Sequence, residues 1–133
     1  MYFNEVFEEV VWEGLPSIWI NNAGNSVMGP LHLQSEEELQ IQLNVHILAT
    51  TCFSRLYIKR ALQDETSRIL INTSSINAYL KPAYLSIYNA SKSYIASFSE
   101  TLGEEMKKLN RNIRIVVTTP GPVETKLVRG LHF

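Results

Sequence analysis

The alternation of apolar and polar positions along the chain predicts three strands that alternate with three helices. Short apolar runs, each followed by a polar or glycine-containing segment, are expected to form buried strands at residues 17–20, 68–72 and 112–117. Apolar residues recur at helical spacing in the segments that precede and separate these runs: residues 3–14, about 36–62 and about 86–109. Strands alternating with long helices predict an α/β fold, a parallel sheet with helices on both faces.

Each predicted helix has an apolar side. In the first helix the apolar positions are Phe3, Phe7, Val10 and Val11, and in the third they are Ile95, Phe98, Leu102 and Met106. The second helix begins with a capping box, in which Ser35 and Glu38 satisfy each other's backbone amides. It has two apolar stripes: Ile41, Val45, Leu48, Cys52 and Leu56, and Leu39, Leu43 and Ile47. Such a helix is expected to be buried on more than one side.

Composition and charge indicate a single globular domain and narrow the class of partner. The 133 residues are 45% hydrophobic and 19% charged, with a formal net charge of −1, so no nucleic-acid or anionic-lipid surface is predicted. Cys52 is the only cysteine, which favours a reducing compartment. We find no membrane-spanning run and no signal peptide, and expect a cytoplasmic protein. The glycosylation patterns at Asn72 and Asn89 are therefore interpreted as accidental.

Three polar segments follow the predicted strands, and ligands of parallel sheets bind beyond the carboxyl ends of the strands. The segments are Asn21 to Gly24, Ser74-Ser75, and Pro120 to Thr125. Metal chemistry is not expected, because His32, His46 and His132 are scattered in the sequence. His46 is interpreted as a helix-surface or packing residue. No Gly-x-Ser-x-Gly motif supports a serine nucleophile.

Tyr88 and Lys92 are the most informative pair. They lie four residues apart on a predicted helix, so their side chains share one face. An ammonium beside a phenol favours the phenolate, which would make the pair a proton donor and acceptor. Tyrosine and lysine at this spacing are also common on solvated helices, so the pair alone does not establish a site.

Ser75 and Asn44 could complete such a site. Ser75 precedes Tyr88 by thirteen residues, just after a strand, where its hydroxyl could orient a substrate oxygen. Ser74 is the alternative, although it could simply cap a turn. Asn44 lies within the second helix, where an amide is unfavourable unless it is solvated or has a partner.

These residues make the chain resemble the short-chain dehydrogenase/reductase family, in the form that has an Asn-Ser-Tyr-Lys tetrad. Asn21-Asn22-Ala23-Gly24 is similar to the family's Asn-Asn-Ala-Gly motif, and Asn44 to its helix asparagine. Ser74-Ser75 corresponds to the serine motif, and Tyr88 to Lys92 to Tyr-x-x-x-Lys. Residues 120–125 correspond to the Pro-Gly segment and its threonine. The resemblance extends from about residue 15 to residue 127 and implies a partial Rossmann-like sheet.

The resemblance implies a role for each matching residue in carbonyl–alcohol interconversion with NADP or NAD. Tyr88 would be the acid and base, Lys92 would bind the nicotinamide ribose and lower the pKa of the phenol, and Ser75 would orient the substrate. Asn44 would hold a water molecule of a proton relay. The remaining residues expected at the cofactor are Asn22, Ala23, Gly24, Pro120, Gly121, Val123 and Thr125.

Within the family, residues 85–88 and the 98–106 helix look most like the branch of 3-ketoacyl-CoA reductases and 17-beta-hydroxysteroid dehydrogenases. That similarity favours NADP over NAD. The family implies a small-molecule ketone or alcohol as substrate. It also implies a homodimeric or homotetrameric parent, in agreement with the two apolar stripes of the second helix, which a further helix of the parent would cover equally well. The endoplasmic reticulum membrane is an alternative location for such a parent.

The chain departs from the family pattern at both ends. No Thr-Gly-x-x-x-Gly-x-Gly turn is present, and the segment after Thr125 is short. We therefore expect residues 1–133 to be a single partial domain that lacks the glycine-rich cofactor half and binds the cofactor weakly by itself. The competing hypothesis is an inactive remnant that serves as a binding or dimerisation module.

Overall fold

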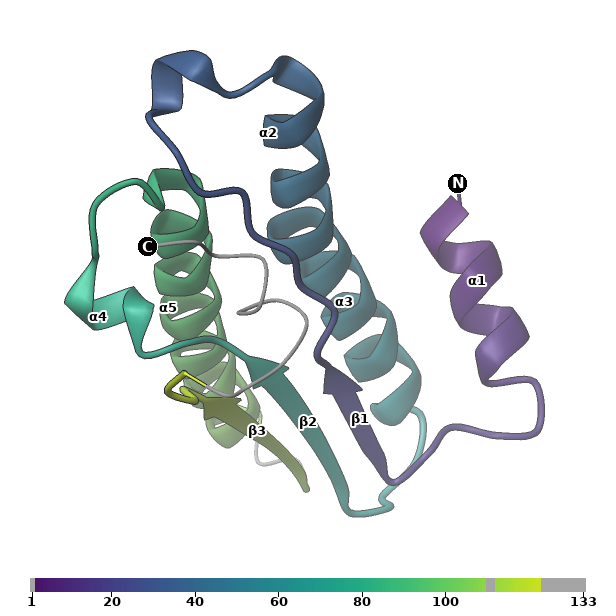
Figure 1. Cartoon of the computed structure of the whole chain (residues 1–133). Coiled ribbons are helices and arrows are strands. Elements are labelled where there is room, and N and C mark those ends of the chain that lie inside the picture. The colour runs from purple at the N-terminus through teal and green to yellow at the C-terminus, as the bar shows by residue number, and fades with distance from the viewer. Residues whose placement is uncertain (1, 110–111, 123–133) are drawn as a thin grey trace.

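The computed structural model describes residues 2–109 and 112–122, which form three strands and a series of helices (Figure 1). The strands are β1 (Ile18–Asn21), β2 (Arg68–Thr73) and β3 (Ile113–Thr118). The helical elements are α1 (Tyr2–Val10), the 3-10 turn η1 (Leu31–Leu33), α2 (Glu36–Leu43), the π-helical segment η2 (Asn44–Ala49), α3 (Thr50–Ala61), α4 (Asn77–Leu80) and α5 (Ser86–Lys108).

The sheet is parallel, with strand order β1-β2-β3. Ile20 of β1 pairs with Ile71 of β2, which pairs with Val116 of β3. This architecture confirms the predicted α/β class and the order of its elements. The three arrowheads in Figure 1 point toward one edge of the sheet, so the segments that follow the strands emerge at the same end.

The helices α1, α3 and α5 pack on one face of the sheet. Trp19 of β1 contacts Phe7 of α1 and Tyr57 of α3, with ring centroids 5.2 and 5.8 Å apart. Right-handed crossovers that advance in one direction across a parallel sheet leave their helices on the same side. Helices on both faces require the strand order to reverse. The expected second helical layer is therefore not found in residues 2–109 and 112–122.

The core lies between this helical layer and the sheet. Phe7, Tyr57, Leu70, Met106 and Ile113 are buried in one cluster. Among the predicted positions of α1, Phe7 and Val11 are buried, whereas Val10 is 61% exposed, because the apolar side of this short helix is narrower than its sequence suggests.

The second predicted helix is present as α2, η2 and α3, which follow one another without a loop from Glu36 to Ala61, and its capping box is present at Ser35 and Glu38. In its N-terminal half Gln42 and His46 are fully buried, but several apolar side chains are not. The apolar side chains of Ile41, Leu43 and Leu48 are between 41% and 47% exposed. Burial on more than one side is thus not found for this part of the helix within the described residues. None of the described helices is long and apolar enough to span a bilayer.

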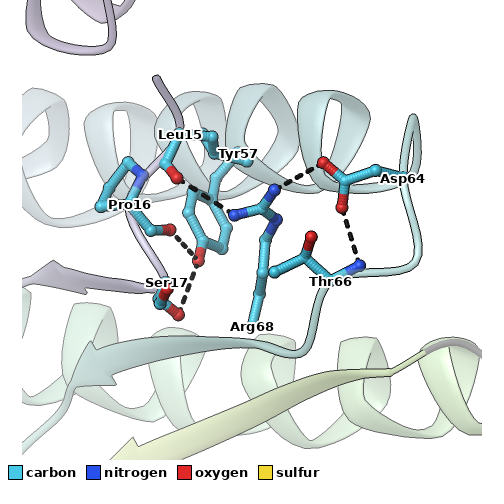
Figure 2. Close-up of polar contacts among 7 residues, drawn as sticks. All are labelled: Leu15, Pro16, Ser17, Tyr57, Asp64, Thr66 and Arg68. Carbon is cyan, nitrogen blue, oxygen red and sulfur yellow. Dashed lines mark hydrogen bonds and ion pairs between the residues drawn. The ribbon is translucent and has the colours of Figure 1, made fainter. Parts of the chain in front are cut away.

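A polar cluster fixes the sheet at the amino ends of β1 and β2, opposite the predicted site (Figure 2). The hydroxyl of buried Tyr57 lies 2.9 Å from the carbonyl oxygen of Pro16 and 3.2 Å from that of Ser17. Burial raises the pKa of Tyr57, so this phenol stays a donor. Arg68 donates to the Leu15 carbonyl and forms an ion pair of 2.7 Å with Asp64. The cluster holds the two strands in register.

Candidate active site

A network of amide and hydroxyl groups lies behind the carboxyl ends of β1 and β2. The amide of Asn21 donates to the Asn72 side-chain oxygen at 2.8 Å and to Ser54 Oγ at 3.1 Å. Asn72 in turn donates to Ser99 Oγ of α5 at 2.9 Å. Asn72, Ser54 and Ser99 are all buried, so each amide and hydroxyl needs a partner inside the protein. The network therefore ties both strands to α3 and α5 at the level of the site.

Helix α5 presents Tyr88 and Lys92 on one face, as their spacing predicts. Lys92 is 4% exposed, and its Nζ donates to the Thr73 carbonyl oxygen at the end of β2 at 2.9 Å. The same Nζ lies 5.6 Å from the centroid of the half-buried Tyr88 ring. Burial lowers the pKa of Lys92 from 10.5 to about 8, because the charged form is desolvated. The ammonium form still predominates at neutral pH.

The two candidate serines make different contacts. Ser74 is buried and donates to the Lys92 carbonyl oxygen at 2.6 Å, so it ties the end of β2 to α5. The Ser75 hydroxyl accepts from the Asn77 amide at 3.2 Å, at the start of α4. Ser75 therefore lies at the same end of the sheet as Lys92. No hydrogen bond joins Ser75 to Tyr88 in the described part of the chain.

The π-helical segment η2 interrupts the second long helix at Asn44, where the sequence predicts a regular α-helix. Asn44 is exposed at the first position of this segment. A π-helical turn inserts a residue and rotates the side chains that follow it, and such turns are frequent at functional sites. The rotation brings His46 into the interior. Local sequence periodicity does not reveal a one-residue insertion, so the sequence alone could not indicate it.

His46 is a residue of this region whose contacts the sequence did not predict. Its ring is fully buried, Nε2 accepts from the Asn25 amide at 3.0 Å, and Nδ1 lies 2.7 Å from Ser91 Oγ. The ring meets Tyr88 edge-on, with centroids 5.5 Å apart. Burial and the nearby charge of Lys92 lower the pKa of His46 from 6.5 to about 4. Its place within an apolar stretch, Val45-His46-Ile47, was the available signal.

The segment after β1 comes close to both basic side chains. A Cβ atom added at Gly24 would lie 3.3 Å from His46 Nε2 and 3.7 Å from Lys92 Nζ. Asn22, Ala23 and Gly24 are exposed, as are Pro120 and Gly121 after β3. Val123 and Thr125 lie outside the described residues.

This end of the sheet fits the ribose of a nicotinamide cofactor. Gly24 leaves the backbone open beside Lys92, and only one of the three N–H donors of Lys92 has a protein acceptor among the contacts described above. The two remaining N–H groups of Lys92 suit the two neighbouring hydroxyl groups of a ribose. Of the predicted cofactor residues before Val123, Gly24 lies beside Lys92, and Pro120 accepts a hydrogen bond of 3.0 Å from the Ile76 amide after β2.

Substitution of Gly24 by alanine is expected to destabilise the chain. A contact of 3.3 Å is tight for a Cβ atom, and His46 cannot move away readily because two hydrogen bonds hold its buried ring. Overpacking of this kind costs about 1–3 kcal/mol. The measurement is the denaturant midpoint at constant slope. Gly121→Ala is the matched control, because its Cβ would meet no atom within 4 Å; equal midpoints for the two variants would contradict the expectation.

Comparison with known proteins shows the class of this protein. The family model of the short chain dehydrogenases matches residues 4–132, so the chain belongs to that family. A 3-ketodihydrosphingosine reductase of Bacteroides thetaiotaomicron is 30% identical over 125 residues, which cover 91% of this chain and 44% of that protein. A 3beta-hydroxysteroid dehydrogenase of Eggerthella lenta is 30% identical over 110 residues, which cover 83% of this chain and 41% of that protein.

The fold is also that of solved members of the family. The crystal structure of a 3-ketoacyl-(acyl-carrier-protein) reductase from Brucella melitensis, complexed with NADH, superposes with a TM-score of 0.86 at 23% identity. The match covers 96% of this chain and 54% of that one. The chain therefore spans less than half the length of the two curated relatives and about half of the solved structure.

Proposed function

We propose that this chain carries the proton-transfer site of an NAD(P)-dependent oxidoreductase that interconverts a carbonyl and an alcohol. The observation that supports the proposal best is the buried Lys92 ammonium, which lies beside the Tyr88 ring at the carboxyl ends of the strands. The Brucella reductase was solved as a complex with NADH, which supports a nicotinamide cofactor for this protein as well. NADP as the preferred form remains a prediction.

Tyr88 would exchange the proton with the substrate oxygen. In reduction, its O–H donates to the carbonyl oxygen as negative charge develops there, and in oxidation the phenolate accepts the alcohol proton. The bound nicotinamide supplies or accepts the hydride at the substrate carbon. Lys92, whose Nζ lies 5.6 Å from the Tyr88 ring centroid, would stabilise the negative charge that develops during proton transfer, and its other N–H groups would hold the ribose hydroxyls.

Ser75 and Asn44 complete the proposed tetrad. The Ser75 hydroxyl accepts from Asn77, so its own proton is available to a substrate carbonyl oxygen. The exposed Asn44 side chain would hold a water molecule that passes a proton from solvent to Lys92. Asn22, Ala23, Gly24, Pro120 and Gly121 would border the cofactor, and Val123 and Thr125 would meet the nicotinamide end.

An apolar ketone or secondary alcohol is the substrate class that we propose. The names of the Bacteroides and Eggerthella relatives both refer to lipid-like molecules with an oxygen at carbon 3. A homodimer or homotetramer is proposed for the whole protein, supported by the exposed apolar residues Ile41, Leu43 and Leu48. The same exposed residues would support the alternative, an inactive dimerisation module.

The test is a carbonyl-reduction assay on the protein that contains this chain. The substrates are a 3-ketosteroid, a 3-ketoacyl thioester and 3-ketodihydrosphingosine, each with NADH and with NADPH, and consumption of the reduced cofactor is followed by absorbance. We expect turnover of at least one ketone that is lost in Tyr88→Phe. Turnover that survives in Tyr88→Phe would contradict the proposed site. If none of the three ketones is reduced with either cofactor, the result would favour the dimerisation module.

A further inference from the structure

We propose that His46 is a positioning residue that holds the Tyr88–Lys92 turn of α5 against the loop after β1. This inference rests on the proposed function, because it concerns the residues that would transfer the proton. It is carried by a continuous chain of hydrogen bonds whose donors and acceptors can be assigned from the geometry.

The series of hydrogen bonds begins at the loop after β1. The backbone amide of Asn25 can only donate, so His46 Nε2 must present its lone pair at 3.0 Å. A neutral ring then carries its proton on Nδ1, which lies 2.7 Å from Ser91 Oγ. Nδ1–H therefore donates to Ser91. The ring is fixed in one tautomer by a partner on each side.

The series of hydrogen bonds ends at the backbone carbonyl of Tyr88. Because the Ser91 hydroxyl accepts from His46, its own proton is free to donate to the Tyr88 carbonyl oxygen at 2.9 Å. Ser91 is fully buried, so this proton needs an acceptor inside the protein. One imidazole thus connects an amide of the loop to the helical turn that bears both Tyr88 and Lys92.

The surroundings of His46 explain why the neutral ring suits this position. The titratable groups that it meets are Tyr88, edge-on at 5.5 Å between centroids, and the Lys92 ammonium. A Cβ atom at Gly24 would lie 3.3 Å from His46 Nε2 and 3.7 Å from Lys92 Nζ, so this glycine lets the loop lie beside both side chains. A charged imidazolium would point an N–H at the Asn25 amide and would repel Lys92. At neutral pH the ring therefore orients the turn without adding charge.

The test is a titration of the Lys92 side chain by NMR in the wild-type chain and in His46→Phe, with the signal assigned by its loss in Lys92→Met. Phe fills the space of the ring but cannot bond. If the turn is released and water reaches Nζ, the pKa of Lys92 rises from about 8 toward 10.5, and we expect at least about a tenfold change in proton affinity. A packing role alone predicts that Phe leaves the pKa unchanged or lowers it.

Two further variants keep the test decisive. His46→Asn retains a donor near Nδ1 but offers no acceptor to the Asn25 amide, and Ser91→Ala removes the link to the Tyr88 carbonyl, so each variant breaks the series of hydrogen bonds and should raise the pKa of Lys92. Ser91→Ala replaces His46→Phe if the latter does not fold. Nitrogen chemical shifts of His46 should also report the Nδ1–H tautomer.

Tyr57→Phe is the matched control, because it removes hydrogen bonds at the opposite end of the sheet and should leave the pKa of Lys92 unchanged. Equal shifts in Tyr57→Phe and His46→Phe, or no shift in either, would overturn the positioning role. The titration needs neither substrate nor cofactor. A chain that reduces no ketone would therefore contradict the proposed function and leave the result for His46 intact.

Discussion

Tyr88→Phe is expected to lower kcat for carbonyl reduction by about 10²–10⁴-fold, the usual contribution of a positioned general acid. The substitution removes one oxygen from a half-buried ring and keeps the ring contact with His46 and the position over Lys92. The barrier rises because the developing oxyanion loses its proton donor, while substrate binding changes little. The loss should therefore appear in kcat rather than in KM.

Tyr94→Phe is the matched control for this experiment. It removes a hydroxyl from the same helix, but Tyr94 donates to or accepts from Thr51 at 2.8 Å, and stacks on Phe98, away from Lys92. Turnover should be essentially unchanged in this variant. A comparable loss in both variants would show that α5 tolerates no tyrosine substitution and would remove the argument for Tyr88 as the proton donor.

Acidification from pH 6.5 to pH 4 is expected to reduce the free energy of unfolding by about 3 kcal/mol through His46 alone. The pKa of His46 is 6.5 in the unfolded chain and about 4 in the folded one, because of burial and the nearby Lys92 charge. Between these values only the unfolded chain takes up a proton, so stability falls as the pH falls. Well above pH 6.5 neither state is protonated and the effect vanishes. Each pKa unit corresponds to about 1.4 kcal/mol.

The measurement is urea unfolding at pH 7, 5.5 and 4 for the wild-type chain and for His46→Phe. The variant starts less stable at pH 7 but lacks the titrating group, so its stability should fall less steeply. Hydrogen bonds to Thr66 and Lys107 lower the pKa values of Asp64 and Glu104. Protonation of such carboxyl groups below about pH 4 reduces the free energy of unfolding, and it does so equally in both proteins. Parallel pH dependence of the two proteins would mean that His46 titrates near its ordinary pKa in the folded chain.

Much of the fold could be predicted from the sequence because its signals are local. The capping box at Ser35 and Glu38 needs only a spacing of three residues, and it is present. Tyr88 and Lys92 share a face because a helix repeats every 3.6 residues, whatever surrounds it. The apolar runs and the turns that end them gave the order of strands and helices, and parallel strands necessarily bring their carboxyl ends to one edge.

The tertiary structure decided what depends on contacts between distant residues. That the helices share one face follows from the strand order β1-β2-β3, and the exposure of Val10 and Ile41 depends on which elements reach them. The π-helical segment at Asn44 and the burial of His46 were likewise decided by the tertiary structure. His46 has its partners at Asn25 and Ser91, 21 and 45 residues away. Its tautomer and its lowered pKa therefore exist only in the folded chain, where a donor and an acceptor from separate elements meet the buried ring.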